Sequence, residues 1–348
     1  MSDINIRVTG QAGRITLTRG AALNALSYDM CMAIDAAMRA WAGDDAVKLV
    51  VIDAEGEKAF CAGGDIAELY DTGTAGDYAY GRKFWRDEYR LNAYIFEYPK
   101  PVVSFLQGFT MGGGVGIGCH GTHRVVGDSS QIAMPEVGIG LIPDVGGTLM
   151  LALAPGRLGE YLGTTASRMK AADAIYAGFA DHYIPESFWP VLISGLERDG
   201  DPQILEFAAQ KPPAGTLEPL QADIDRCFAG ETLTDILTVL RADESDFSET
   251  TLRTMGRNAP LAMACTVELL HRLRGSQLGI RKALKNEYRY TYRSMEKGDF
   301  LEGIRAQIID KDRQPKWKYA AQEVPASAVS QMLMPLGADA LVFEEENT

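Results

Sequence analysis

Residues 27–54, SYDMCMAIDAAMRAWAGDDAVKLVVIDA, contain the pattern that decides the fold class. Apolar side chains recur at helical spacing as far as Trp41, and Ser27 stands where it can cap the first turn of a helix. Residues 48–54 then form an almost continuous apolar run, which is typical of a buried strand in a parallel sheet. A helix that leads into such a strand predicts a right-handed strand–helix–strand unit.

The pattern extends in both directions from this unit. Two short strands are expected before it, on either side of a turn at residues 11–13. Further strands are expected at residues 101–108, 123–128 and 131–136, with glycine-rich turns and helical stretches between them. We therefore predict an α/β fold with a mixed sheet.

The second half of the chain has a different character. Strand signals fade after about residue 185, and residues 248–297 have a helical pattern rich in arginine and lysine. We predict an α/β core over residues 1–200 and a helical C-terminal region over residues 201–348 that packs on this core.

The composition excludes several classes of protein. With 348 residues, of which 46% are hydrophobic and 23% charged, the chain can form a packed core. Its formal net charge of -13 repels nucleic acid and anionic membranes. An anionic ligand would therefore need backbone N–H groups or a local basic patch. Such a patch is expected in the C-terminal segments RTMGR, HRLRG, IRKALK and EYRYTYR.

The cysteines and the N-terminus give expectations about location. The five cysteines are scattered, and none forms a C-x-x-C pair, so we predict neither a disulfide framework nor a metal site. The first ten residues, MSDINIRVTG, lack the apolar segment of a secretory signal and the arginine-rich pattern of a transit peptide. No apolar run reaches the roughly 18 residues of a membrane helix. We expect a cytoplasmic protein without membrane or nucleic-acid partners.

Two glycine clusters can present backbone N–H groups to a ligand. The first contains Gly63 and Gly64, followed by Asp65, which is expected to cap a helix together with Glu68. The second, Gly112–Gly113–Gly114, follows an apolar strand and opens another helix. Two such amides that converge on one oxygen form an oxyanion hole, which stabilises the tetrahedral intermediates of acyl transfer. Either cluster alone is more often a device for tight packing.

The second cluster also permits a rival interpretation. Residues 116–121, GIGCHG, match the G-x-G-x-x-G pattern of dinucleotide-binding proteins. The preceding strand leads first into Gly112, however, so this match is expected to lie inside the helix rather than at a phosphate-binding turn. A dinucleotide-dependent oxidoreductase is therefore kept only as an alternative.

Two carboxylates mark the third signal. Glu136 and Asp144 lie in MPEVGIGLIPDVGG, which is otherwise apolar or glycine and a costly place for a charge unless it is paired or used. Taken alone, Asp144 could equally cap a helix, and Glu136 could be a partly exposed strand end. Serine-hydrolase, zincin and P-loop motifs are absent from the sequence, and an isolated apolar-flanked cysteine such as Cys61 is more often core than nucleophile.

Taken together, these segments resemble the crotonase (enoyl-CoA hydratase/isomerase) superfamily. The resemblance rests on RITLTRGAALNALS, KAFCAGGDI, GFTMGGGVGIGCHGTHRV and IAMPEVGIGLIPDVGG. Residues 84–92, 156–184 and 286–318 are further similar to the 3-hydroxyisobutyryl-CoA hydrolase branch. This resemblance implies a crotonase-like spiral of ββα units with a helical C-terminal region.

The resemblance also implies roles for individual residues. It makes the N–H groups of Gly64 and Gly113 the oxyanion hole for a thioester carbonyl, and Glu136 and Asp144 the catalytic carboxylates. Gly113, Glu136 and Asp144 would contact the substrate together with Glu88, which by itself would pass as a surface charge on a helix. Arg19, Ala62 and Gly64 would contact the CoA moiety.

Two positions separate hydrolases from hydratases within the resemblance. Typical hydratases have a second glutamate where this chain has Gly116, and typically glycine where it has Asp144. Both differences favour hydrolysis of 3-hydroxyisobutyryl-CoA to 3-hydroxyisobutyrate and free CoA, a step of valine catabolism. The alternative is an enoyl-CoA hydratase that acts on short 2-enoyl-CoA esters.

The expected chemistry needs no cofactor, because coenzyme A is part of the substrate. Glu136 could activate water as a general base or attack the carbonyl as a nucleophile, and the residues leave both open. A CoA-ester binding protein without activity is a further alternative, against which the presence of both carboxylates argues. The expected partner is a short acyl-CoA, and a homo-oligomer is possible.

Overall fold

The computed structural model describes residues 3–275 and 277–343, and it divides into two compact units that alternate along the chain. Unit 1 comprises Met1–Asp65, Arg90–Ala133 and Arg168–Glu218. Unit 2 comprises Ile66–Tyr89, Met134–Ser167 and Pro219–Thr348. Each unit therefore takes segments from both halves of the sequence, and the single boundary that was predicted at residue 200 stays a prediction.

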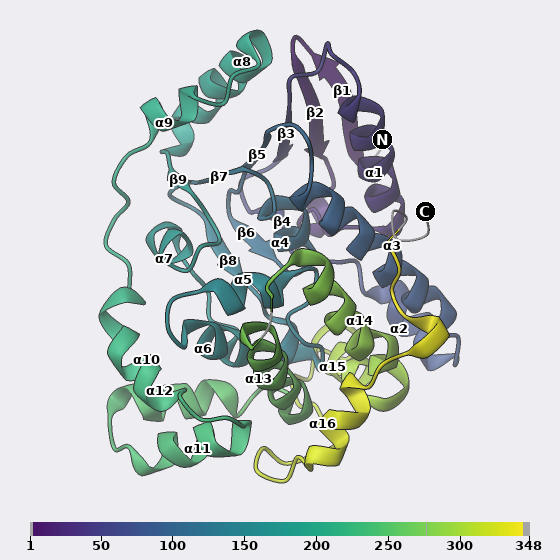
Figure 1. The fold of residues 1–348 in the computed structure, drawn as a ribbon, viewed down its shortest axis with the longest axis vertical. Helices are drawn as coiled ribbons and strands as arrows, with labels where there is room; N and C mark the ends of the chain where they lie inside the picture. The colour runs from purple at the N-terminus through teal and green to yellow at the C-terminus, as the bar shows by residue number, and fades with distance from the viewer. Residues whose placement is uncertain (1–2, 276, 344–348) are drawn as a thin grey trace. The chain divides into compact units, whose positions relative to one another are not determined.

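Unit 1 contains both sheets (Figure 1). The larger sheet has the strand order β1-β2-β3-β5-β7-β9, and only the β1–β2 pair is antiparallel. Its strands are Ile4–Thr9, Ala12–Leu17, Leu49–Ala54, Val102–Phe105, His123–Val126 and His182–Tyr183. The smaller sheet is parallel, in the order β4-β6-β8, with strands Ala59–Cys61, Phe109–Met111 and Gln131–Ala133. The predicted α/β fold with a mixed sheet is confirmed.

The strand–helix–strand unit of the sequence appears as β2, α1 and β3. Helix α1 runs over Tyr28–Ala42, and the Ser27 side chain accepts a hydrogen bond of 3.2 Å from the N–H of Met30, as its predicted capping role requires. Strand β2 is buried along its whole length and pairs with β3 in parallel. One face of the sheet packs against α8 (Trp189–Asp199) and α9 (Ile204–Ala208) through a cluster that includes Leu49, Val103 and Trp189.

Beside the short 3-10 turns η1 (Gly20–Ala22) and η3 (Glu186–Phe188), three further α-helices lie in the part of unit 1 that the structure describes, one of them only in part. These are α4 (Gly113–Gly118), α7 (Ala171–Tyr176) and the C-terminal part of α3 (Ala79–Phe96), within which the boundary between the units falls. The G-x-G-x-x-G match begins at Gly116 inside α4, as predicted. It therefore does not form the turn between a strand and a helix that holds a dinucleotide phosphate.

Unit 2 is helical in the residues that the structure describes. Beside the short turns η2 (Glu136–Ile139), η5 (Arg305–Ile309) and η6 (Gly337–Asp339) and the N-terminal part of α3, its α-helices are α2 (Ala67–Thr74), α5 (Gly147–Leu153), α6 (Leu158–Thr165), α10 (Gln221–Cys227), α11 (Leu233–Ala242), α12 (Asp246–Met255), α13 (Pro260–Arg274), α14 (Ile280–Lys297), α15 (Phe300–Ile304) and α16 (Ala326–Leu333). Helices α12, α13 and α14 lie where the sequence predicts helix, so the helical C-terminal region is confirmed.

A buried ion cluster joins α6 to α13. Glu160 has no exposed surface, and it accepts a hydrogen bond of 2.9 Å from Arg157 and a further one from Arg274. The ring of His271 lies 3.3 Å from the same carboxylate. Burial opposes ionisation of Glu160, but these hydrogen bonds and the charge of Arg274 outweigh it and lower its pKa to about 2.

The predicted capping role of Asp65 is wrong. Helix α2 begins at Ala67 after an N-cap residue, Ile66, that makes no side-chain cap. The Asp65 carboxylate lies 2.7 Å from the Arg19 guanidinium, and the two form an ion pair. Asp65 therefore pairs with Arg19, 46 positions earlier in the chain, whereas its spacing to Glu68 had predicted a helix cap.

Candidate active site

The two glycine clusters follow neighbouring strands of the smaller sheet in unit 1. Because β4 and β6 are parallel, Gly64 and Gly113 both lie beyond the carboxyl end of this sheet. A Cβ atom on Gly114 would lie 2.3 Å from the carbonyl oxygen of Cys61. Only glycine permits this close approach of α4 to the end of β4, so packing accounts for one residue of the triple glycine.

Among the described residues, neither the N–H of Gly64 nor that of Gly113 donates to a backbone carbonyl, for different reasons. The residues on either side of Gly64 exchange hydrogen bonds with Leu26, which leaves the N–H of Gly64 pointing away from that partner. Gly113 is the first residue of α4, and the first N–H groups of a helix have no acceptor within the helix. A Cβ on Gly64 would meet no heavy atom within 4 Å, so its surroundings are open.

Unit 2 brings together four buried carboxyl groups. Glu88 comes from α3, Glu136 from η2, Asp144 from the loop before α5 and Glu287 from α14. Each has at most 5% of its surface exposed. The charge of Asp144 raises the pKa of each of the other three, which places all four within one electrostatic cluster.

Asp144 is held by a tyrosine that the sequence analysis did not identify. The hydroxyl of Tyr89 donates a hydrogen bond of 2.6 Å to Oδ2 of Asp144. Burial raises the pKa of Asp144 to about 7, although this hydrogen bond lowers it. Asp144 does not cap a helix with its side chain, because the N-cap of α5 is Gly146 and makes no side-chain cap.

Glu136, unlike Asp144, accepts no side-chain hydrogen bond from the described residues. Among the residues that the structure describes, neither of its carboxylate oxygens has a hydrogen-bond partner, although both are buried. Burial raises its pKa well above the usual range, and the charge of Asp144 adds to this rise. A partly exposed strand end is therefore the wrong interpretation of Glu136. A buried carboxyl without a partner is costly, which points to a functional role.

Glu88 is not a surface charge. Its side chain is 3% exposed, and burial raises its pKa well above the usual range, with a further rise from Asp144. Its neighbours in sequence, Arg86 and Asp87, pair with each other on the more exposed side of α3. The structure thus brings Glu88 into the cluster that contains Glu136 and Asp144.

Glu287 is the second residue that the sequence analysis missed. It accepts hydrogen bonds from the N–H of Gly146 at 2.8 Å, from the N–H of Thr148 at 3.0 Å and from the Thr148 hydroxyl. Burial raises its pKa to about 8 in spite of these donors. Tyr89 and Glu287 both lie in segments that carry the resemblance, and this was the one signal that could have found them.

The candidates for contact with CoA lie in unit 1. Arg19 pairs with Asp65 and donates to the carbonyl of Ala25 at 3.2 Å, and its side chain is 27% exposed. The N–H of Ala62 donates to the carbonyl of Leu23 at 3.0 Å. The Arg19 charge is therefore already shared with an acidic neighbour.

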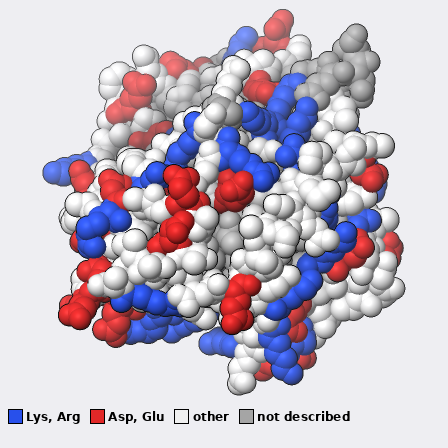
Figure 2. Space-filling view, turned by 60° about the horizontal axis from the view of Figure 1, so that its bottom comes forward, with Lys and Arg blue, Asp and Glu red and all other residues white. Residues whose placement is uncertain are grey.

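Several arginines of the basic C-terminal segments also have partners within the protein. Arg253 and Arg272 pair with Glu249 and Glu268 one helical turn away, and Arg293 donates to carbonyls that include that of Met334. On the face drawn in Figure 2, Lys and Arg side chains stand among Asp and Glu side chains rather than forming one uniform basic surface. The predicted basic patch is thus interrupted by acidic partners.

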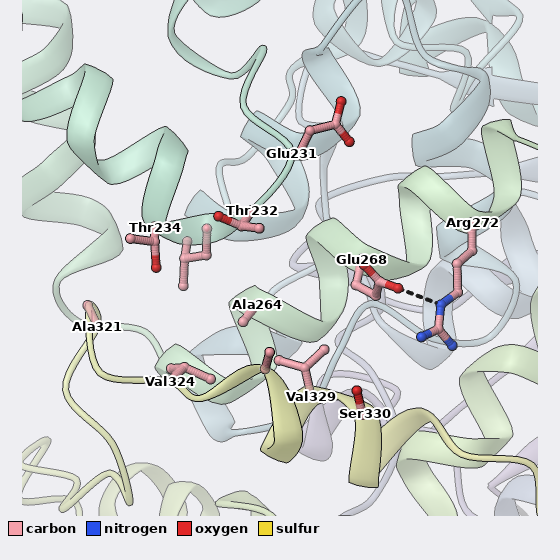
Figure 3. A pocket seen from close by; sticks show the side chains of 12 residues that line it. Glu231, Thr232, Thr234, Ala264, Glu268, Arg272, Ala321, Val324, Val329 and Ser330 are labelled. Carbon is pink, nitrogen blue, oxygen red and sulfur yellow. Dashed lines mark hydrogen bonds and ion pairs between the residues drawn. The ribbon is translucent and has the colours of Figure 1, made fainter.

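A pocket of about 260 Å³ lies elsewhere in unit 2, at α11, α13 and α16 (Figure 3). Thr232, Ala264, Val329 and the ion-paired Glu268 and Arg272 contribute to its lining. It contains none of the four clustered carboxyl groups.

No described helix is both long enough and apolar enough to cross a membrane. Likewise, His, Cys, Asp and Glu side chains in the described part of the chain form no group of three or more that could hold a metal ion.

The chain matches a known protein family over most of its length. Residues 12–333 match the family model described as enoyl-CoA hydratase/isomerase. The chain is 36% identical to the 3-hydroxyisobutyryl-CoA hydrolase, mitochondrial, of Gallus gallus, over 97% of this chain and 90% of that protein. It is 39% identical to the protein of the same name from Xenopus tropicalis, over 88% of this chain and 82% of that protein.

Solved structures give a second comparison. A crystal structure of an enoyl-CoA hydratase from Rhodobacter sphaeroides 2.4.1 is 55% identical, with a TM-score of 0.94, and covers 98% of this chain and 100% of its own. One of a carnitinyl-CoA dehydratase from Mycobacterium thermoresistibile is 40% identical with the same TM-score, and covers 99% of both chains. The names of these relatives disagree on the reaction, but both solved structures share the fold of this chain, and the predicted crotonase-like fold is confirmed.

The prediction of a cytoplasmic location is contradicted. The relatives from Gallus gallus, Xenopus tropicalis and Homo sapiens are named as mitochondrial proteins. The prediction rested on scattered cysteines and on the absence of a recognisable leader pattern. Cysteine usage reports on redox conditions and does not separate one reducing compartment from another.

Proposed function

The chain belongs to the enoyl-CoA hydratase/isomerase family, and we propose that within it the protein hydrolyses the thioester of 3-hydroxyisobutyryl-CoA to 3-hydroxyisobutyrate and free CoA. This reaction would serve valine catabolism. The names of the relatives from Gallus gallus and Xenopus tropicalis support the substrate. The reaction needs no cofactor, since CoA enters as part of the substrate.

In this proposal the amides of unit 1 polarise the thioester carbonyl. The N–H groups of Gly64 and Gly113 donate to the carbonyl oxygen, which becomes negative as the tetrahedral intermediate forms. The C–S bond then breaks, and the CoA sulfur leaves as a thiolate that takes up a proton.

Glu136 is proposed to start the attack on the carbonyl carbon, either through water or directly. As a general base it takes a proton from the attacking water, and as a nucleophile it forms a mixed anhydride that water then hydrolyses. Both routes need an ionised Glu136, and its buried position makes that form costly in the free protein. Turnover is therefore expected to increase as the pH rises and Glu136 ionises.

The observation that favours hydrolysis over hydration is the environment of Asp144. This carboxyl is buried, accepts from Tyr89, and its charge raises the pKa of Glu136, whereas the residue of α4 where hydratases have their second glutamate is Gly116. We propose that Asp144 and Glu88 bind the 3-hydroxyl group or the attacking water. A site built to hydrogen-bond a hydroxyl strongly rejects the analogue that lacks it.

The CoA moiety is proposed to contact Arg19, Ala62 and Gly64. Arg19 would bind a phosphate as the cation of a pair whose other member is Asp65, since its side chain is partly exposed. A homo-oligomer stays a prediction of the sequence.

Hydration of a short 2-enoyl-CoA ester is the second candidate. It is favoured by the name of the Rhodobacter sphaeroides protein, which is 55% identical to this chain. Hydration adds water across a carbon–carbon double bond and leaves the thioester intact, so the two reactions have different products.

A thiol-release assay separates the candidates. Purified protein is supplied with 3-hydroxyisobutyryl-CoA, with isobutyryl-CoA and with crotonyl-CoA, while free thiol and enoyl absorbance are followed. Hydrolysis predicts thiol release from the first ester, and release on the order of a hundredfold slower from the second, which lacks the hydroxyl. Loss of enoyl absorbance from crotonyl-CoA, with no thiol released from the hydroxy ester, would overturn the proposal.

A further inference from the structure

The loop that carries Asp144 has an unusual backbone. Val145 has a φ of 53° and Gly146 a φ of 84°, so two successive residues after Asp144 lie in the left-handed region. For a β-branched residue such as Val145 this conformation is rarely populated and persists only where the surroundings impose it. The position of Asp144 therefore depends on whatever holds this turn.

Glu287 holds the turn from one side. Its two oxygens accept from the N–H groups of Gly146 and Thr148, which flank the first residue of α5. The remaining N–H in this stretch, that of Gly147, donates to the carbonyl of Asp144 at 2.7 Å. One buried carboxylate thus fixes the backbone directly after Asp144.

Tyr89 holds the side chain from the other side. Its hydroxyl donates to Oδ2 of Asp144 and lies 3.4 Å from the hydroxyl oxygen of Thr291. Thr291 follows Glu287 by one turn on α14, so a single helix face supports both the turn and the tyrosine. All four side chains are buried, which removes competing water from these contacts.

We infer that Tyr89 and Glu287 are positioning residues for Asp144, the first fixing its carboxylate and the second its backbone. The inference rests on the proposed role of Asp144 in catalysis. Neither residue is proposed to touch the ester, and both act through Asp144. Displacement of a reacting group by about 1 Å can cost on the order of a hundredfold in rate, so these contacts matter for turnover.

The first test measures Asp144 directly and does not require activity. Carbon-13 spectra of protein labelled at the aspartate carboxyl carbons are recorded across pH, and the Asp144 signal is identified as the one missing from D144N. Loss of the donor in Y89F is expected to raise the pKa of Asp144 by roughly one pH unit. Y288F is the control, because the Tyr288 hydroxyl that it removes donates to the carbonyl of Arg82 and not to Asp144.

The second test separates positioning from folding. Thiol release by E287Q is expected to show a kcat lowered by on the order of tenfold, with KM nearly unchanged, and faster amide hydrogen exchange at residues 144–149. E296Q is the control on the same helix, because Glu296 pairs with Arg82 at the surface. An exchange pattern in E287Q equal to that of the unaltered protein would show that Glu287 does not hold the turn.

The outcomes distinguish this inference from the proposed function. If no ester releases thiol but Y89F still raises the Asp144 pKa, the function is wrong and the support by Tyr89 stands. If thiol is released but the Asp144 pKa is the same in Y89F, Tyr89 is not a positioning residue. Should Y89F fail to fold, fluorotyrosine at position 89 keeps the ring size and donates more strongly. The inference then requires a lower Asp144 pKa, and an unchanged one overturns it.

Discussion

The hydroxyl of Tyr89 lies 2.6 Å from Oδ2 of Asp144 and donates to it, whereas Glu136 in the same carboxyl cluster has no such donor among the described residues. A hydrogen bond to the ionised form stabilises that form. Asp144 is therefore expected to ionise before Glu136 as the pH rises, and its charge then raises the pKa of Glu136 further.

The first prediction concerns the pH dependence of thiol release. The pKa of Asp144 is raised to about 7 and that of Glu136 lies well above its usual range. Because the ionised forms are needed, kcat/KM should rise with pH through 7. In D144N the neighbouring charge is gone, the pKa of Glu136 falls, and the rise moves to lower pH while the maximum rate drops. A rate that stays constant from pH 5 to 9 would contradict this account.

The second prediction concerns Glu136 itself. E136Q is close in size to the native residue but cannot accept a proton or attack a carbonyl. Loss of a general base or nucleophile costs on the order of a hundredfold to ten-thousandfold in kcat. Binding of the CoA ester, measured by calorimetry, should be retained. Full activity in E136Q would remove Glu136 from the mechanism.

The third prediction concerns the triple glycine. In G114A the new Cβ would lie 2.3 Å from the Cys61 carbonyl oxygen, so the end of β4 and the start of α4 must separate. We expect a loss of roughly 2 kcal/mol in the free energy of unfolding, measured by urea denaturation. G64A is the control for stability, because its Cβ meets open space. Equal stabilities of the two variants would show that the close approach is not required.

The fourth prediction concerns the Glu160 cluster. E160Q leaves two arginines beside a buried amide and should cost about 3 kcal/mol in the free energy of unfolding. E249Q removes an exposed partner of Arg253 and should cost no more than about 0.5 kcal/mol. A similar small effect in both variants would mean that burial does not strengthen the Glu160 pairs.

The same cluster predicts a dependence of stability on pH. The pKa of Glu160 is about 2 in the folded protein and near 4.5 when unperturbed. A depressed pKa contributes stability above the unperturbed value, and this contribution is lost as the pH falls from 4.5 towards 2. The difference in unfolding free energy between the unaltered protein and E160Q should shrink over this range in denaturant titrations.

Periodicity and cap chemistry were enough to predict six of the nine described strands, α1 and the helical region from residue 248, whereas the short strands β4, β6 and β9 were not predicted. These features depend on neighbours within a few positions, as the contact of Ser27 with Met30 illustrates. The same reasoning assigned Asp65 to a helix cap and failed, because Arg19 is close in space but distant in sequence. Rules based on sequence neighbours cannot predict a partner that only the folded chain brings close.

The support around Asp144 could not be predicted for the same reason. Tyr89 precedes Asp144 by 55 positions, and Glu287 binds backbone groups 139 and 141 positions away. Glu88 was expected at the surface because its segment is rich in charge, although its own side chain faces inward. Which side of a charged helix is buried depends on packing that the sequence of that helix does not specify.

The alternation of the two units along the chain has a consequence for biosynthesis. All residues of unit 1 have been made once synthesis passes Glu218, whereas unit 2 needs its third segment, Pro219–Thr348. Glu88, Glu136 and Asp144 emerge from the ribosome well before α14 brings Glu287. Until α14 has been made, the turn after Asp144 lacks its hydrogen bonds to Glu287, and a nascent chain interrupted before residue 280 contains every proposed catalytic residue without this support.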